Sequence, residues 1–376
     1  MKSELFLDLP ITLRQLDLLT VELPLKEPFL SAIGKRMTRE ALIVRWISQD
    51  GVIGYGECSC RPDPYYSHEF LDAAVFMAQR FIIPALKPNS TLRKLHQSIK
   101  KIRGWNFTKA AFEFACCDAV ERFHHCNIID NFGFNTIEKI PVGISMGIYS
   151  DLLELQERTY KSIKDGYRRV KFKIRPGSAR PDFIHWLEEL DFDLISFDAN
   201  GSFDHSDFEA LNAFAQLGYI IEQPFRHGSI YLEKEFQSTY SPLNICLDEE
   251  IESLHDVKRL EGSYLEINLK PGRVGGIVET MNIIKYCLKK SIPCWIGGMF
   301  ETGIGRKLNL RLASLLHEAR AHDLSPSSRY FEEDLLDKPI VMENGYIDYD
   351  SLSSMEVSEE MIKNHLKDNR IISFKY

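Results

Sequence analysis

The stretch "VKFKIRPG", residues 170–177, places two lysines, Lys171 and Lys173, in a run of β-branched and aromatic residues. Such a run predicts a strand that is at least partly buried. Residues two positions apart on a strand share a face, so both cations should point the same way. The stretch therefore raises the question of why a buried strand would carry two cations.

Short apolar segments of the same kind recur from about residue 140 onward, separated by segments with helical spacing of apolar residues. We expect strands at 141–145, 168–174, 194–198, 219–223, 244–248, 265–270, 293–297 and, with a weaker pattern, 322–325. Eight strands that alternate with helices predict a (β/α)8-type barrel of the α/β class.

The N-terminal region has a different pattern. Residues 11–25 and 41–58 alternate apolar and polar residues and break at "QDG", which predicts antiparallel strands and a hairpin. Residues 66–87 and 106–125 have helical spacing, with Asn106 or Thr108 as the expected N-cap. We therefore expect three parts: an α+β domain at 1–130, the barrel at 131–330, and a C-terminal segment at 331–376 that packs back on the first domain.

The composition is that of an ordinary globular protein, with 376 residues, 44% hydrophobic content and a net charge of −8. No long basic run is present, which argues against a nucleic-acid or anionic-membrane surface and favours a small-molecule partner. The N-terminus lacks the apolar core of a signal peptide, so we expect a cytoplasmic protein. The cysteines lie mostly in apolar runs and are expected to be reduced core thiols. The sequence does not settle whether the chain forms a homo-oligomer.

Polar residues collect at the predicted carboxyl ends of the strands, where barrel enzymes carry their chemistry. They are Lys171, Lys173, Asp198, Glu222, Asp248 and Lys270. From Lys173 onward their spacing is close to one strand–helix unit at each step. We therefore expect all six to face one mouth of the barrel.

Three carboxylates on consecutive strands, Asp198, Glu222 and Asp248, predict a metal site. Three hard oxygen ligands with no thiolate or imidazole suit Mg²⁺, and Mn²⁺ would also fit. Glu249 follows directly after Asp248. Because adjacent strand residues point to opposite faces, we expect only Asp248 to enter the barrel.

The lysines predict proton transfer beside this metal. Two ammonium groups about 7 Å apart repel by about 2 kcal/mol at an effective dielectric near 20, which should lower the pKa of Lys171 or Lys173. A lysine with a lowered pKa can act as a general base near neutral pH. Lys270 would approach the substrate from the other side. This arrangement suits removal of a proton next to a carboxylate that the metal binds.

These residues resemble the enolase superfamily, and within its muconate-lactonizing subgroup the branch of o-succinylbenzoate synthases and N-succinylamino acid racemases. The matching stretches are "VKFKIRPG" (170–177), "FDAN" (197–200), "IEQP" (221–224), "CLDE" (246–249), "INLKPGRVGG" (267–276), "WIGGMFETGIGRKLNLRLASL" (295–315), "PFLSAIG" (28–34), "PYYSHE" (64–69) and "SSRYFEEDL" (327–335). Leu30 in "PFLSAIG" departs from the polar residue that relatives often have. The resemblance implies an α+β capping domain built from both termini over the barrel.

The resemblance also implies roles for individual residues. Mg²⁺ would be bound by Asp198, Glu222 and Asp248, and the catalytic groups would be Lys173 and Lys270 with Lys171 in support. Substrate contacts are expected from Asn200, Ser145, Gly298 and Met299.

The implied reaction is the Mg²⁺-dependent syn-dehydration of 2-succinyl-6-hydroxy-2,4-cyclohexadiene-1-carboxylate in menaquinone biosynthesis, catalysed by a carbon–oxygen lyase. The alternative is racemisation of N-succinyl or other N-acyl amino acids by the same two lysines. A mandelate-racemase-like site is disfavoured because the seventh strand, "WIGGMFE", has no histidine. A dipeptide epimerase is less favoured because "HDLSPSSRY" replaces a DxD element. An inactive barrel with a binding role remains the alternative from a different class.

Overall fold

The computed structural model describes residues 2–31, 34–131, 134–192, 194–240, 242–317 and 319–376. The expectation for Leu30 and the "PFLSAIG" loop (28–34) concerns side chains and residues that lie outside the described part of the structure.

Seven parallel strands form the sheet that the sequence predicts, in the order β13-β12-β11-β10-β9-β8-β7. These are β7 (Ile144–Met146), β8 (Val170–Lys173), β9 (Ile195–Asp198), β10 (Ile220–Glu222), β11 (Ile245–Leu247), β12 (Glu266–Leu269) and β13 (Cys294–Ile296). Consecutive strands are neighbours throughout, as expected for repeated strand–helix units.

The eighth position of the ring is held by two isolated bridges. Val142 pairs with His322, and Gly297 pairs with Asp323, so this segment joins the first and last strands of the sheet. The backbone N–H of Ile296 donates a hydrogen bond to the imidazole Nδ1 of His322 at 3.0 Å. In a regular strand pair, the acceptor would be a backbone carbonyl oxygen. The weak pattern at 322–325 therefore corresponds to a closing segment and not to a regular strand.

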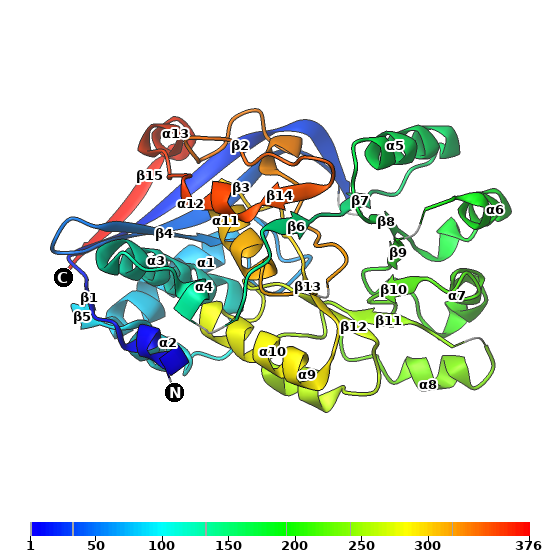
Figure 1. Ribbon diagram of the computed structural model, residues 1–376, viewed down its shortest axis with the longest axis horizontal. Coiled ribbons are helices and arrows are strands. Elements are labelled where there is room, and N and C mark those ends of the chain that lie inside the picture. The colour runs from blue at the N-terminus through cyan, green and yellow to red at the C-terminus, as the bar shows by residue number, and fades with distance from the viewer. Residues whose placement is uncertain (1, 32–33, 132–133, 193, 241, 318) are drawn as a thin grey trace.

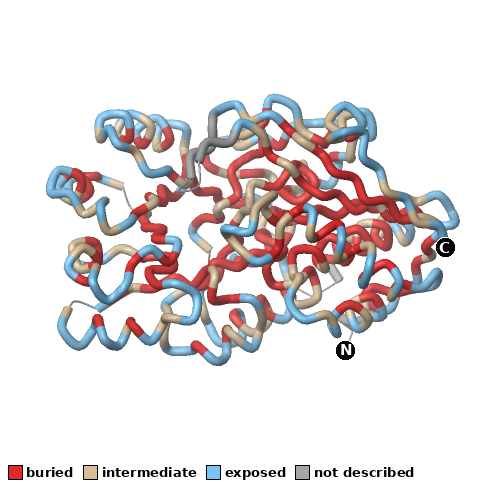
Figure 2. The backbone as a smooth tube through the Cα atoms, turned by 180° about the vertical axis from the view of Figure 1, so that it is seen from behind, coloured by how far each residue is buried: buried red, intermediate tan, exposed pale blue. Residues whose placement is uncertain are grey.

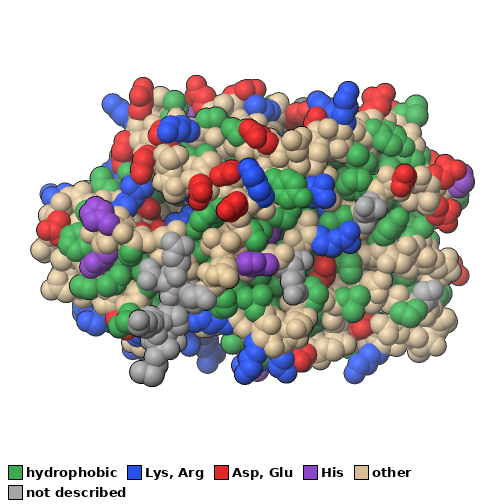
Figure 3. Space-filling model, viewed as in Figure 1, with side chains coloured by type: hydrophobic (Ala, Val, Ile, Leu, Met, Phe, Trp, Pro, Cys, Tyr) green, Lys and Arg blue, Asp and Glu red, His purple; other side chains and the backbone are tan. Residues whose placement is uncertain are grey.

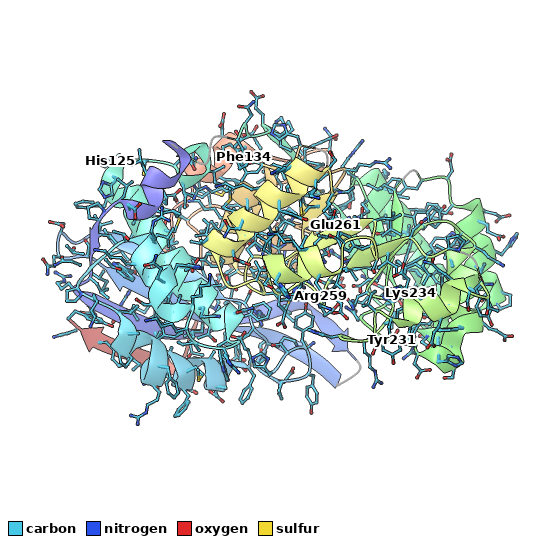
Figure 4. All side chains as sticks on the ribbon, turned by 90° about the horizontal axis from the view of Figure 1, so that it is seen from below. His125, Phe134, Tyr231, Lys234, Arg259 and Glu261 are labelled. Atoms are coloured by element: carbon cyan, nitrogen blue, oxygen red, sulfur yellow. The ribbon has the colours of Figure 1, made fainter. Side chains whose placement is uncertain are left out.

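Helices follow the strands on the outside of the sheet (Figure 1). They are α5 (Leu152–Lys164), η4 (Pro176–Ser178), α6 (Pro181–Glu189), η5 (His205–Asp207), α7 (Phe208–Ala215), α8 (Leu232–Gln237), α9 (Leu254–Arg259), α10 (Ile277–Lys290) and α11 (Gly303–Ala313). Figure 4 shows Arg259 and Glu261 at the end of α9, and Tyr231 and Lys234 at α8, on this outer layer, where all four are exposed.

A separate antiparallel sheet has the order β15-β2-β3-β4. Its strands are β2 (Gln15–Ser31), β3 (Gly34–Ile47), β4 (Ile53–Cys58) and β15 (Leu366–Lys375). The turn between β3 and β4 contains the predicted "QDG". Because β15 pairs with β2, with Ile372 opposite Leu18, the two ends of the chain build one capping domain beside the barrel (Figure 1).

The capping domain also has several short elements and one long helix. They are η1 (Lys2–Asp8), β1 (Ile11–Thr12), α1 (Leu71–Met77), a π-helical turn η2 (Ala78–Ile82), η3 (Ile83–Ala85), β5 (Asn89–Ser90), α2 (Leu92–Ile99), α3 (Asn106–His124) and α4 (Ile128–Asn131). Helix α3 packs closely on β4, since a Cβ at Gly56 would lie 2.0 Å from the carbonyl oxygen of Ala111.

The predicted N-cap of α3 is wrong. The helix begins after Trp105, and neither Asn106 nor Thr108 caps it. Instead, the Glu69 carboxylate accepts the backbone N–H groups of Phe107 and Thr108 at 3.0 and 2.9 Å. A carboxylate supplied by a preceding loop satisfies the free N–H groups of the first turn, so no local capping residue is needed.

The C-terminal segment contacts the barrel as well as the capping domain. Strand β14 (Tyr346–Asp348) pairs with β6 (Lys139–Pro141), which directly precedes the first barrel strand. The segment also contains α12 (Tyr349–Ser353) and α13 (Glu359–Asn364), and η6 (Ser327–Arg329) directly precedes it.

Burial follows the two sheets. Figure 2 shows buried residues concentrated along the capping sheet and the barrel strands, with exposed residues along the outer helices. On the face in Figure 3, acidic and basic side chains are interspersed. Seven of the eight cysteines are buried and all eight are free, as predicted. None of the helices in the described ranges combines the length and the apolar character needed to cross a membrane.

Candidate active site

Lys171 lies at the centre of a buried ion-pair cluster. Its ammonium group is 2.7 Å from Oε2 of Glu222 and 3.0 Å from Oδ2 of Asp323, and its side chain is 4% exposed. Burial alone would lower the pKa of Lys171, but the charges of Asp323, Glu222 and Asp198 raise it well above its ordinary value. A lowered pKa was expected for Lys171 or Lys173; for Lys171 that expectation is wrong, because carboxylates outweigh the neighbouring cations.

Lys173 is the more open lysine of the pair, with 31% of its side chain exposed. Its ammonium group lies 3.1 Å from Oδ2 of Asp198 and also contacts the amide oxygen of Asn200. Asn200 adopts a left-handed conformation (φ 44°) immediately after β9, which turns its side chain toward Lys173. Of the two strand lysines, Lys173 is therefore the one placed to meet a ligand.

The three predicted metal ligands lie side by side. Asp198 ends β9, Glu222 ends β10 in register with it, and Asp248 follows β11 directly. All three are buried. Burial, reinforced by Asp198 and Asp248 and only partly opposed by Lys171, raises the pKa of Glu222 to about 8. Negative charge is therefore crowded at this edge of the barrel.

The chemistry of this donor set fits a hard divalent cation, because all three predicted ligands are carboxylates and the charges of Asp198 and Asp248 help to raise the pKa of Glu222. The carboxylates are turned toward cationic side chains instead of toward one another. Among the residues that the structure describes, no three acidic, histidine or cysteine side chains are grouped closely enough to enclose a metal ion. A bound cation would therefore replace some of the lysine contacts.

Lys270 stands across the barrel from the lysine pair. Its strand, β12, is four positions from β8 in the strand order, which in an eight-membered ring is the opposite side. The Nζ of Lys270 lies 2.7 Å from Oδ2 of Asp248 and 3.0 Å from the hydroxyl of Tyr66. Burial would lower the pKa of Lys270, but the Asp248 charge outweighs it and raises that pKa.

Arg273 completes this side of the site. Its guanidinium contacts Asp248, donates to the Tyr66 hydroxyl at 3.2 Å and donates to the Asn268 carbonyl oxygen at 2.8 Å. Burial, together with the Asp248 charge, raises the pKa of Tyr66 to about 12, so this residue stays a neutral phenol. Asp248 is thus held by Lys270 and Arg273 together.

The other expected substrate-contact residues surround the eighth position. The hydroxyl of Ser145 donates to the Asp323 carboxylate at 2.9 Å. A Cβ at Gly298 would lie 2.8 Å from both the Asp323 carbonyl oxygen and a guanidinium nitrogen of Arg306, so only glycine fits there. The backbone N–H of Met299 donates to Oε1 of Glu301 at 2.8 Å. Ser145 and Lys171 therefore share the Asp323 carboxylate, and Gly298 packs against the backbone of Asp323.

Sequence reasoning missed three residues of the cluster, Asp323, Tyr66 and Arg273, and misplaced a fourth. Asp323, in "HDLS", pairs with Lys171, and Tyr66, in "PYYSHE", contacts Lys270. Glu249 was expected to point away, but its Oε1 accepts from the amide of Asn200 at 3.3 Å. Strand β11 ends at Leu247, so Asp248 and Glu249 lie in a turn where the alternation of faces no longer applies.

The capping domain fixes the loop after β13. The buried Glu57, in β4, accepts the backbone N–H groups of Thr302 and Gly305 and the Thr302 hydroxyl, at 2.7 to 3.1 Å for its Oε2. It thereby caps α11 of the barrel. The guanidinium of Arg39 donates to the Phe300 carbonyl oxygen at 3.2 Å. Both contacts hold the segment that carries Gly298 and Met299.

Known proteins have the same fold and are similar to this chain in sequence. The family described as "Enolase C-terminal domain-like" matches residues 154–353. An o-succinylbenzoate synthase of Enterococcus faecalis is 34% identical over 89% of this chain and 92% of its own. An N-succinylamino acid racemase of Amycolatopsis sp. is 33% identical over 88% and 90% of the two chains. A crystal structure of an enolase-superfamily member from Listeria innocua superposes with a TM-score of 0.89, at 28% identity, covering 97% of this chain and 99% of the other.

The chain therefore belongs to the enolase superfamily. The resemblance inferred from the sequence motifs and the expected fold, a barrel with a capping domain, are both confirmed.

Proposed function

We propose that the protein is an o-succinylbenzoate synthase, a lyase that removes water from 2-succinyl-6-hydroxy-2,4-cyclohexadiene-1-carboxylate and leaves o-succinylbenzoate. The observation that carries this proposal is the difference between the two facing lysines. Lys173 has 31% of its side chain exposed, whereas Lys270 has 9% and is engaged by Asp248 and Tyr66. The sequence similarity to the Enterococcus faecalis synthase supports it.

The metal would be Mg²⁺, held by Asp198, Glu222 and Asp248. Bound there, it would supply positive charge that offsets the substrate carboxylate and the negative charge that develops as the adjacent proton leaves.

Lys173 would carry the proton. As a free amine it takes the proton next to the substrate carboxylate, and as an ammonium it returns a proton to the hydroxyl that leaves on the same face, so that water departs and the ring becomes aromatic. Asp198 and Asn200, which contact its Nζ, position it for both steps. Lys171, fully enclosed by carboxylates, would hold the cluster together and not exchange protons.

Lys270 would remain an ammonium on the opposite face. Its bonds to Asp248 and Tyr66 fix its position, and its charge would stabilise the ring carrying the developing negative charge. Asn200, Ser145, Gly298 and Met299 would line the substrate site.

The second candidate is racemisation of N-succinyl or other N-acyl amino acids, supported by the 33% identity to the Amycolatopsis racemase. That reaction removes a proton on one face and returns one on the other, so both Lys173 and Lys270 would have to exchange protons. Because Lys270 is buried and bonded to Asp248 and Tyr66, the site favours dehydration over racemisation.

Other parts of the proposal extend beyond the site. We place the reaction in menaquinone biosynthesis in the cytoplasm, with a small-molecule carboxylate as substrate and without a nucleic acid or membrane partner. We also retain the domain boundaries at 1–130, 131–330 and 331–376.

The test is formation of o-succinylbenzoate by the purified protein with Mg²⁺. Lys173→Ala should lower the rate by several orders of magnitude, because both proton transfers depend on this side chain. Lys164→Ala, on the surface at the end of α5, is the matched control and should leave the rate unchanged. A Lys173→Ala rate within tenfold of the wild type would contradict the assignment of the base.

A further inference from the structure

A second buried charge lies deeper in the barrel than the proposed site. Arg169 precedes β8, two residues before Lys171, and is 4% exposed. Its guanidinium carbon lies 4.0 Å from the centre of the Trp295 ring, in stacking contact. Stacking uses the face of the guanidinium and leaves its N–H groups pointing outward from the edge.

Two of the three guanidinium nitrogens have no acceptor among the residues that the structure describes. The Nε and Nη2 atoms of Arg169 are both buried and without a hydrogen-bond partner. Within the described part of the chain, no carboxylate forms an ion pair with Arg169, whereas Lys171 has three such contacts. The charge of Arg169 acts on Asp323, whose pKa it helps Lys171 to lower, but Asp323 does not bond the buried Nε and Nη2. A buried donor without an acceptor is costly.

His322 adds a further donor in the same region. Its Nδ1 accepts the Ile296 N–H, and burial together with the Arg169 charge lowers its pKa to about 3. The ring is therefore neutral with its proton on Nε2, and this buried Nε2 also has no partner. Ser196, the register partner of Lys171 on β9, has a buried hydroxyl without a partner as well.

The amino-terminal end of the strands is hollowed close to this region, but Arg169, Ser196 and His322 do not line the hollow. A cavity of about 580 Å³ opens there, and its lining includes Pro141, Tyr167, Arg168 and Leu194. These residues shortly precede Gly143, Arg169 and Ser196 along their strands. A Cβ at Gly143 would lie 3.3 Å from Nε of Arg169, so the glycine leaves the edge of the guanidinium uncovered on that side.

We propose that the barrel interior binds a small monovalent anion of chloride size between Arg169 and His322, below the layer of Lys171. The groups without partners are N–H donors and one hydroxyl, which suit a single small anion. A dianion such as sulfate would bring an uncompensated charge into the same buried region. The site borders the carboxylate cluster at Asp323, which directly follows His322. The inference rests on the donors without partners and does not depend on the proposed function.

Two measurements test this on the intact protein. In crystals of the wild type grown with sodium bromide, an anomalous peak should lie within hydrogen-bonding distance of the Arg169 guanidinium. In solution, the Tm should rise with sodium chloride or bromide and level off at saturation, but not with sodium gluconate at equal ionic strength.

Variants locate the anion. Arg169→Met should lose the halide-specific rise in Tm, whereas Arg168→Met, which removes an adjacent exposed cation that stacks on Tyr346, should keep it. The proposal is overturned by a wild type without a bromide peak at Arg169, by an equal response to gluconate or a larger one to sulfate, or by loss of the response in Arg168→Met alone. If Arg169→Met does not fold, the bromide experiment on the wild type decides.

Discussion

The hydroxyl of Tyr66, in the loop that follows β4, lies 3.0 Å from Nζ of Lys270 at the end of β12. A residue of the capping domain thus contacts a lysine of the barrel site directly. The same hydroxyl accepts a bond from Arg273, so it helps to hold the cations on both sides of Asp248.

Tyr66→Phe should therefore slow the reaction without unfolding the protein. The ring remains in place over Lys270, but the two hydrogen bonds are lost. At about 1 kcal/mol for each bond, the expected fall in kcat is roughly thirtyfold. Steady-state kinetics of the dehydration measure it. Tyr65→Phe is the matched control, since Tyr65 is 66% exposed, and equal rates for the two variants would remove Tyr66 from the site.

Lys270→Arg separates the two candidate reactions. Arginine keeps the positive charge but cannot act as a base near neutral pH. We expect a measurable part of the dehydration to remain, while racemisation of N-succinyl amino acids is lost. Proton exchange at the α-carbon in D₂O, followed by NMR for each substrate enantiomer, monitors the racemisation. A variant that still racemises would show that Lys270 is not a required base.

Removal of divalent cations should abolish turnover, and Mg²⁺ or Mn²⁺ should restore it. Glu222→Gln should be inactive but folded, because the proposed role of this carboxylate is to bind the metal. Circular dichroism checks the fold, and titration calorimetry with Mg²⁺ checks the binding. Full activity in excess chelator would exclude the proposed metal site.

Glu57 should make stability depend on pH. Burial raises its pKa from an ordinary value of 4.5 to about 7 in the folded protein. Between these values the folded state binds more protons at this group than the unfolded state does, so the free energy of unfolding falls as pH rises. The contribution is at most on the order of 3 kcal/mol.

Denaturant unfolding of wild type and Glu57→Gln from pH 4.5 to 7.5 measures this contribution. The wild type should lose stability relative to the variant across that range, and the difference should level off above pH 7. Glu157→Gln, at an exposed position on α5, serves as the control and should follow the wild type. A pH-independent difference between wild type and Glu57→Gln would show that Glu57 does not titrate there.

The sequence predicted the position of the site because strand ends and two-residue periodicity are local features. Lys173, Asp198, Glu222 and Lys270 all end or follow their strands, as expected. The contacts that were missed are not local: Asp323 lies 152 residues beyond Lys171, and Tyr66 lies 204 residues before Lys270. Which partner a buried lysine takes depends on how the ring closes and on where the capping domain sits.

The direction of the Lys171 pKa could not be predicted for the same reason. The local sequence shows only further cations, such as Arg169 and Lys173, whereas the surrounding carboxylates come from three other positions of the ring. Glu249 was misplaced because the strand was predicted to end at Asp248, whereas β11 ends at Leu247. Asp248 and Glu249 therefore lie outside the strand, where adjacent side chains need not point to opposite faces.

The most direct test is a comparison of kcat/KM for the two reactions on the same purified, Mg²⁺-loaded protein. One arm follows dehydration of 2-succinyl-6-hydroxy-2,4-cyclohexadiene-1-carboxylate, and the other follows racemisation of N-succinyl amino acids. The enclosed Lys270 and the more exposed Lys173 predict the larger value for dehydration. A racemisation kcat/KM that is tenfold or more above that for dehydration would contradict the proposed function and assign the site to racemisation.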